Sequence, residues 1–307
     1  MVVGSARDFL EQAQHPDAIS FVDQPGMDVL TKVNHVSIPS SVVAIVDESL
    51  PIAVNWLQPN PWLSHVMSAA MLKHPMAEKH LENLAATLDS TSEPRLLDWL
   101  GPEVEGRRIR LTHASKRAER LERMGEFLEA KGVSPRATQQ LRDAAEELVT
   151  NAFYDAPVTA GASKPISRTQ DVELPEKNAC DLAYGCRDDL AIVRVRDPFG
   201  SLSRRRLVEV LSRCAQPNMS VQVDESMGGA GLGMWRIFSN ASLVAISVVK
   251  HRHTEILVGI AKRVTGPRPF AFHLFFRDGA KRRFWRLSTD TSIPAVNNSV
   301  MLELKSK

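Results

Sequence analysis

The sequence is poor in cysteine and in long apolar runs, and each deficit excludes a class of protein. Only 3 of the 307 residues are cysteine, at Cys180, Cys186 and Cys214, an odd number without a C-x-x-C spacing. Neither a disulfide framework nor a tetrahedral zinc site is therefore indicated. No run approaches the roughly 18 apolar residues of a membrane span, and the start lacks the layout of a secretory signal. We expect a cytoplasmic protein without a membrane partner.

The charge is distributed unevenly along the chain. The hydrophobic fraction of 43% and charged fraction of 24% are those of a globular protein. Residues 1–104 hold 5 Lys and Arg against 13 Asp and Glu, a net charge of −8, so the total of +2 leaves +10 for the remainder. This step, in a chain long enough for two domains, predicts two parts of different character.

The pattern of the acidic part predicts a small α/β domain over residues 1–104. Short apolar runs at 18–22, 42–46 and 65–71 alternate with helix-like stretches such as 76–88. The sequence then turns to Ser, Thr, Glu, Pro and Gly over 90–102, where we place the linker.

The second part is predicted over residues 105–265. Apolar residues at helical spacing over 114–128 predict one helix, and Ser134 followed by Pro135 opens another that runs to about Asp155. After an exposed loop, two hairpins follow, 180–185 with 190–196 and 243–250 with 255–262. We therefore expect an α+β sandwich with a mixed, mainly antiparallel sheet covered on one face by helices.

The last part, residues 266–307, is predicted to add a β-hairpin packed on this domain. Its two strands, 270–276 and 282–287, flank Asp278-Gly279, a strong hairpin signal.

Three separated segments carry the chemistry. The first is the second helix, where Glu147 and Asn151 are four residues apart and so share one side. A carboxylate and an amide oxygen placed together suit Mg²⁺, which favours oxygen ligands, water and substrate phosphates. Taken alone, such a pair is usually the solvated side of an amphipathic helix.

The second and third segments are a strand end and a glycine-rich loop. Asp197, Pro198, Phe199 and Gly200 follow an apolar strand, where a carboxylate can accept a hydrogen bond from an amino group such as that of adenine. Alone, this segment reads as a turn. Residues 228–234 hold four glycines before a helix start, a backbone that can approach phosphates closely. The dinucleotide and Walker patterns are both absent.

In combination, these segments resemble the N, G1 and G2 boxes of the GHKL ATPase superfamily. The short distance between boxes and the absence of a phosphoacceptor histidine helix make the chain most similar to anti-sigma-factor serine/threonine kinases. The resemblance covers roughly residues 107–263 and implies ATP and Mg²⁺ as cofactors. The sequence departs from the family at residues 157–178, which look like an insertion, and in D-P-F-G in place of D-x-G-x-G.

The resemblance also implies roles for individual residues. Glu147 would be the general base, Asn151 would coordinate Mg²⁺, and Asp197 would hold the adenine amino group. Residues 201–227 would form a mobile lid over ATP. The other implied nucleotide-binding residues are Asp155, Gly200, Gly229, Gly231, Leu232 and Gly233.

The implied function is transfer of the ATP γ-phosphate to a Ser or Thr of a partner protein, under control of the first domain. The partner would be an anti-anti-sigma-like substrate or a sigma factor, and related modules also form homodimers. No nucleic-acid partner is expected. Two alternatives stay open: a non-catalytic, nucleotide-gated binding module, and a histidine-kinase-like ATPase.

Asp47 is a candidate phosphoacceptor in the first domain. With Glu48, Ser49, Leu50 and Pro51 it resembles the segment after the phosphorylatable strand of two-component receivers. The alternative is an unrelated α/β sensor or docking domain in which Asp47 is a turn carboxylate.

Overall fold

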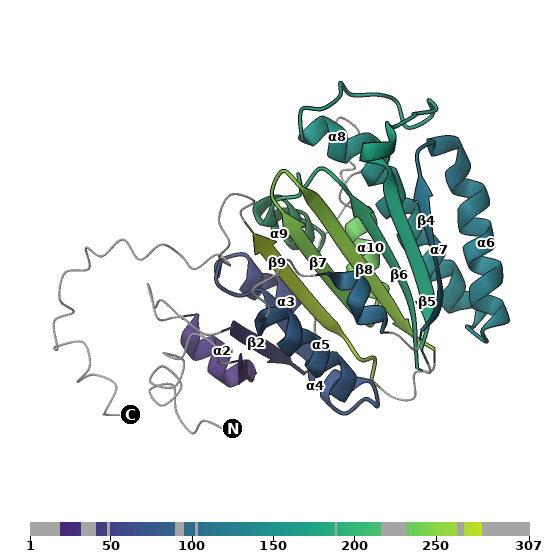
Figure 1. Cartoon of the computed structure of the whole chain (residues 1–307). Coiled ribbons are helices and arrows are strands. Elements are labelled where there is room, and N and C mark those ends of the chain that lie inside the picture. Colours follow the sequence, from purple (N-terminus) through teal and green to yellow (C-terminus); the bar gives the residue numbers. More distant parts are fainter. Residues whose placement is uncertain are drawn as a thin grey trace, which may run out of the picture.

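A computed structural model of the chain describes residues 19–31, 41–47, 50–89, 95–101, 104–187, 189–215, 232–262 and 267–277 (Figure 1). The strands are β1 (Ile19–Val22), β2 (Ser41–Val46), β3 (His65–Ser68), β4 (Glu105–Leu111), β5 (Cys180–Cys186), β6 (Leu190–Asp197), β7 (Leu243–Val249), β8 (His253–Ala261) and β9 (Ala271–Arg277). The helices are α2 (Gln24–Leu30), α3 (Leu50–Leu57), α4 (Ala69–Leu72), α5 (Ala77–Asp89), α6 (Arg117–Ala130), α7 (Pro135–Thr150), α8 (Ala156–Thr159), α9 (Arg204–Cys214) and α10 (Leu232–Asn240). Shorter turns are η1 (Leu96–Leu100), η2 (Ala114–Lys116), η3 (Asn151–Asp155) and η4 (Glu176–Asn178).

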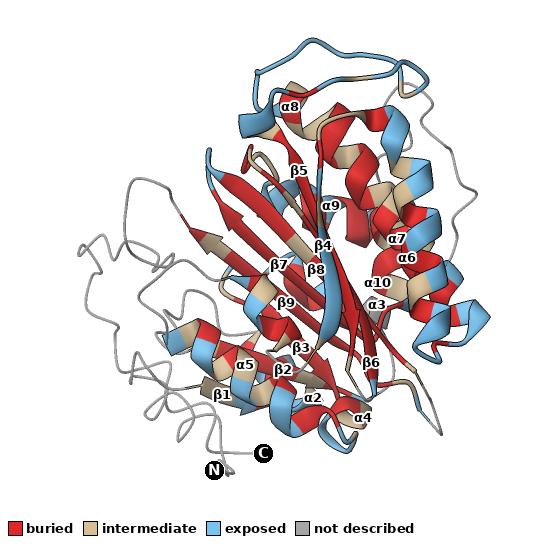
Figure 2. Cartoon of the chain, turned by 45° about the vertical axis from the view of Figure 1, so that its right-hand side comes forward, coloured by how far each residue is buried: buried red, intermediate tan, exposed pale blue. Residues whose placement is uncertain are grey.

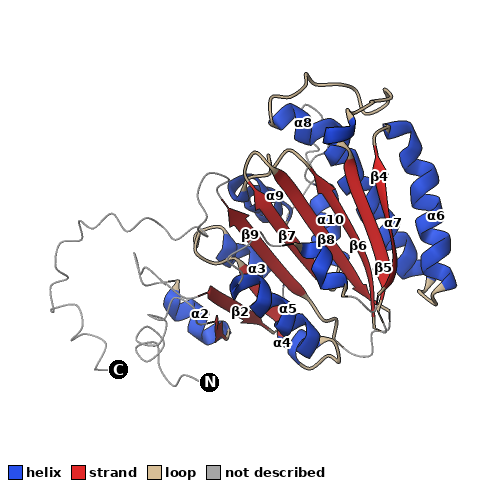
Figure 3. Ribbon diagram, in the orientation of Figure 1, coloured by secondary structure: helices blue, strands red, loops and turns tan. Residues whose placement is uncertain are grey.

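One sheet of nine strands crosses the whole molecule, in the order β1-β2-β3-β9-β7-β8-β6-β5-β4 (Figure 3). The pairs β1 with β2, β2 with β3 and β7 with β9 are parallel, and the other five are antiparallel. The predicted mixed, mainly antiparallel fold is therefore confirmed, as are both predicted hairpins, β5 with β6 and β7 with β8.

The last described strand joins the two parts of the chain. β9 pairs with β3 of the acidic part on one side and with β7 on the other. The predicted partner of β9, residues 282–287, lies outside the described residues. The sheet is continuous across residue 104, and the division into domains there stays a prediction based on the charge step.

The acidic part differs from a receiver domain. Its three described strands, β1, β2 and β3, are parallel and adjacent in chain order, with β2 in the middle. In a receiver, the first strand lies between the second and the third. The receiver-like interpretation is therefore wrong for the described strands, and a different α/β unit is present.

Helices cover both faces of the sheet. One core contains residues of α2, α3, α6, α7, α9 and α10, and the other lies under α4, α5 and η1. η1 was predicted as linker, yet Leu96 and Trp99 are buried in it. Figure 2 shows that β4, an edge strand, stays exposed along most of its length.

Both predicted helices of the second part are present as α6 and α7, but α7 ends at Thr150 and α9 lies within the predicted lid. Ser134 caps α7, and its hydroxyl accepts a hydrogen bond from the Ala137 N–H at 3.3 Å. Gly132 adopts a positive φ of 75° after α6, as a helix C-terminus favours. At 16 residues, α7 is the longest helix described. None of the described helices is long and apolar enough to cross a membrane.

Candidate functional site

The polar face of α7 and the start of α10 meet directly. α7 packs on β6 and β8 and also contacts α10. Gly233, in the first turn of α10, lies so close to Glu147 that a Cβ at residue 233 would overlap its carboxylate. A side chain at residue 233 would therefore require the Glu147 carboxylate to move away from this contact with the first turn of α10.

Glu147 is half-buried and linked to Asn151. The Asn151 Nδ2 group donates a hydrogen bond to Glu147 Oε1 at 3.2 Å, so the predicted pairing across one helix turn is present. Burial raises the pKa of Glu147 above its usual value, against the opposing effects of the Asn151 hydrogen bond and of Arg168. A carboxylate with a raised pKa is the more effective proton acceptor near neutral pH.

Asn151 has an unused oxygen. Its Oδ1 atom is buried and has no hydrogen-bond partner among the described residues. An orphaned amide oxygen of this kind fits a ligand of Mg²⁺. Within the described ranges no cluster of three or more His, Cys, Asp and Glu is arranged to hold a metal ion by itself. That is compatible with Mg²⁺, which keeps several waters and binds substrate phosphates.

A π-type turn, η3, follows α7 and begins at Asn151. Such turns are frequent at functional sites because they shift side chains relative to a regular helix. At its end, Asp155 accepts a hydrogen bond from Arg168 at 2.6 Å. The Tyr154 hydroxyl donates to the Gln170 carbonyl at 2.6 Å. The exposed loop that looked like an insertion is thus tied to the site helix.

Asp197 is buried at the end of β6. Its Oδ1 accepts a hydrogen bond from the Phe199 N–H at 2.8 Å. Burial raises its pKa to about 6, against the effect of the backbone hydrogen bonds from Phe199 and Gly200. A carboxylate has about four acceptor positions, and Phe199, Gly200 and Thr254 compete for them in the unliganded protein.

The turn after Asp197 depends on Gly200. This residue has a φ of 59°, and a Cβ there would overlap the carbonyl oxygen of Val249. The next residue, Ser201, donates from its hydroxyl to the Ala156 carbonyl at 3.2 Å. The D-P-F-G turn and the end of η3 are therefore in contact, as a shared site would require.

The structure does not describe all of the remaining predicted residues. Gly229 and Gly231 lie outside the described residues, and Leu232 is the first residue of α10. Asp47 is exposed and follows β2, five strand positions from β6. At roughly 4.8 Å per strand, about 24 Å separates those two strands.

The sequence interpretation missed two arginines beside Glu147. Arg168 comes from the exposed loop, and Arg236 lies one turn after Gly233 on α10; both lower the pKa of Glu147 electrostatically. Arginine suits phosphate geometry. Arg168 had no local signal in its polar loop. For Arg236, the available signal was its place in the helix that follows the glycine-rich segment.

Arg204, predicted as part of the lid, contacts the acidic part of the chain. It begins α9, and its terminal nitrogen lies 2.8, 2.9 and 2.9 Å from the carbonyl oxygens of Leu57, Asn60 and Leu63. α3 and α9 also pack together. The helix that follows the Asp197 turn is therefore fastened to the end of α3.

The chain has a structural similarity to a known protein but no match by family model or to a curated protein. Among solved structures it is similar to a chain of the SiaB-SiaC complex from Pseudomonas aeruginosa, with a TM-score of 0.36 and 16% sequence identity. That similarity covers 60% of this chain and 99% of the other chain.

Proposed function

We propose that the chain is an ATP-binding signalling protein of the GHKL type that transfers the γ-phosphate to a Ser or Thr hydroxyl of a partner protein. The observation that carries this proposal is the meeting of Glu147, Asn151 and Gly233. Two segments that are far apart in sequence supply these groups: the end of α7 gives a carboxylate and an orphaned amide oxygen, and α10 gives a glycine-containing helix start.

The proposed roles follow from the chemistry of the groups. Asn151 Oδ1 would coordinate Mg²⁺, which when bound neutralises phosphate charge and positions the γ-phosphate. The start of α10 would face the phosphates. Asp197 would accept a hydrogen bond from the adenine amino group, and the Asp197 turn positions that carboxylate through Gly200.

Glu147 would accept the proton of the attacking hydroxyl. As the hydroxyl oxygen bonds to the γ-phosphorus, the bond to the β-phosphate oxygen breaks and ADP leaves with the electron pair. Two features favour this role: the raised pKa of Glu147 and its hydrogen bond to Asn151, which ties the base to the proposed metal ligand.

Control by the acidic part is proposed to act through Arg204. Because this residue binds three carbonyl oxygens at the end of α3, any shift of α3 moves the start of α9. Transfer to Asp47 within one chain is disfavoured by the roughly 24 Å between β2 and β6. The histidine-kinase-like alternative is therefore the weaker one.

The experiment combines turnover with transfer. Purified protein with Mg-ATP is assayed for phosphate release, and then for labelling of a protein in an extract of the source cells. We expect Glu147→Gln to lose both activities and to keep ATP binding. Glu146→Gln is the matched control, because Glu146 pairs with Arg117 at 2.7 Å. ATP binding without turnover or labelling would instead support a nucleotide-gated binding module.

A further inference from the structure

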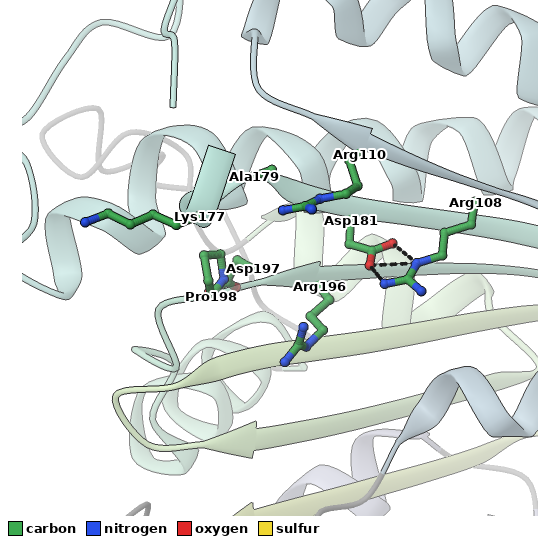
Figure 4. A pocket seen from close by; sticks show the side chains of 8 residues that line it. All are labelled: Arg108, Arg110, Lys177, Ala179, Asp181, Arg196, Asp197 and Pro198. Atoms are coloured by element: carbon green, nitrogen blue, oxygen red, sulfur yellow. Dashed lines mark hydrogen bonds and ion pairs between the residues drawn. The ribbon is translucent and has the colours of Figure 1, made fainter. Parts of the chain in front are cut away.

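A pocket lies beside β4, β5 and β6, on the face of the sheet opposite to α7. Its volume is about 230 Å³ (Figure 4). Side chains alternate along a strand, so Arg194 and Arg196 point away from the helix-covered core that contains Val195. The residues that line the pocket are Arg108, Arg110, Lys177, Ala179, Asp181, Arg196, Asp197 and Pro198.

Two lining residues, Arg108 and Asp181, belong to a row of paired charges that continues beneath the pocket lining. Arg108 forms an ion pair with Asp181, drawn as dashed lines in Figure 4. Arg194 lies 3.2 Å from Asp181 and 2.6 Å from Glu255. Glu255 also accepts the Leu97 N–H at 3.0 Å. Asp181 is thus neutralised from two sides, and the row is held in place across four strands, β4, β5, β6 and β8, and η1.

Three further cations stand above this row without strong carboxylate partners. Arg196 forms no ion pair with any residue in the described part of the chain, although it is half-buried. Among the described residues, Arg110 forms an ion pair only with the exposed Glu176, at 3.4 Å, and it also donates to the Glu176 carbonyl at 2.7 Å. Lys177 is exposed. Figure 4 shows these side chains on different sides of one opening.

The charge balance of the lining is positive. Four cations, Arg108, Arg110, Lys177 and Arg196, stand against two carboxyls, Asp181 and Asp197, which gives 4 − 2 = +2. Burial lowers the pKa of Arg196 despite the opposing effects of Glu255 and Asp181, so these carboxylates compensate its positive charge only in part. An anion in the pocket would supply further negative charge.

We propose that this pocket binds a small, multiply charged oxyanion of the phosphate class. Guanidinium groups pair with phosphate oxygens through two parallel hydrogen bonds, and Arg110 and Arg196 both line this pocket, as does Lys177. The volume is below the roughly 300 Å³ at which pockets for drug-sized ligands begin, which favours a small ion. The site goes beyond the proposed ATP function, because its cations Arg110, Lys177 and Arg196 have no part in that function, although Asp197 lines this pocket as well.

The test is calorimetric titration of the full chain with pyrophosphate in EDTA at low salt. EDTA removes Mg²⁺ and so separates this site from the nucleotide site. We expect the double variant Arg110→Gln/Arg196→Gln to weaken binding at least tenfold, and Arg196→Lys to weaken it less. Arg205→Gln is the matched control, since Arg205 has an 89% exposed side chain on α9. Thermal melts confirm that each variant is folded.

Several results would overturn the proposal. They are an absence of pyrophosphate binding by the unaltered chain, equal affinity in the double variant, and loss of the EDTA-insensitive binding in Asn151→Ala. The last result would place the ion at the nucleotide site. Binding of an acidic peptide such as polyglutamate, without binding of pyrophosphate, would also overturn the proposal. It would indicate that the pocket binds an acidic segment of a protein instead of a small oxyanion.

Discussion

Gly233 lies directly against the carboxylate of Glu147, in a space that admits no Cβ. The two residues are 86 positions apart in sequence, so the contact exists only because α7 and α10 pack side by side. This contact connects Glu147, the proposed base, to the helix start that would face the phosphates. A methyl group added at residue 233 would therefore displace the base.

Gly233→Ala is expected to displace Glu147 and reduce phosphate release by about 100-fold, since a positioned general base contributes roughly 10²- to 10⁴-fold. Gly125→Ala is the matched control. Gly125 is likewise a helical glycine, within α6, and an added Cβ there meets the Arg142 side chain at 3.0 Å instead of Glu147. Steady-state phosphate release measures the effect. Equal rates in the two variants would remove Glu147 from the reaction.

Asp197 is expected to make the unliganded protein less stable as the pH rises from about 4 to 6. Its pKa is raised from 3.8 to about 6, so the folded state binds more protons than the unfolded state in this range, and stability falls with rising pH. The loss is on the order of 3 kcal/mol for this one group.

The comparison that isolates this effect is Asp197→Asn, which cannot ionise. Urea unfolding of both proteins at pH 4 and pH 7 should show the variant gaining stability relative to the unaltered chain as the pH rises. A constant difference between the two proteins would show that Asp197 does not titrate in this way.

A buried row of histidines is expected to oppose this trend in acid. His273 lies 3.2 Å from His65 and 2.9 Å from His80, between their ring nitrogens, and all three rings are buried. Burial lowers the pKa of His65 to about 3 and that of His80 to about 4. The unfolded state therefore binds protons that the folded state excludes below pH 6.5, and stability falls as the pH falls.

His80→Gln keeps a hydrogen-bonding side chain and removes one titrating ring. Between pH 6 and pH 4.5 it should reduce the slope of unfolding free energy against pH by about 1.4 kcal/mol per pH unit. Unfolding free energies from urea titrations give the slope. An unchanged slope would mean that His80 is protonated in the folded protein.

Arg204→Gln should loosen the attachment of α9 to α3. The loss of charge-assisted hydrogen bonds to three carbonyl oxygens is expected to cost about 2 kcal/mol. Hydrogen exchange of residues 57–63 should accelerate. Arg205→Gln is the control and should cost less than about 0.5 kcal/mol, because its pair with Glu209 is exposed. Equal hydrogen-exchange rates of residues 57–63 in the two variants would show that Arg204 does not stabilise the end of α3.

Local patterns in the sequence predicted the helices and hairpins of the second part well. The cap at Ser134, the stop at Gly132 and the shared face of Glu147 and Asn151 all depend on residues within one or two turns. The place of Gly200 after a strand, in D-P-F-G, likewise predicts a turn, and its positive φ agrees with that prediction.

Long-range pairing was not predictable in the same way. Nothing local marks β9 as the strand between β3 and β7, since that position depends on two partners more than 20 residues away. Leu96 and Trp99 lie within the predicted linker but are buried. The apolar run at residues 96–100 is the local feature that indicates this burial. Arg168 and Arg204 gain their partners only through tertiary contacts.

The most direct test of the account is calorimetric titration with ATP, with and without Mg²⁺, for the unaltered chain and for Asn151→Ala. The orphaned Oδ1 of Asn151 predicts binding that is strengthened by Mg²⁺, and an affinity loss of about 10- to 100-fold in the variant, confined to the Mg²⁺ condition. Absence of ATP binding by the unaltered chain, or equal Mg-ATP affinity in the two proteins, would contradict the proposed nucleotide site.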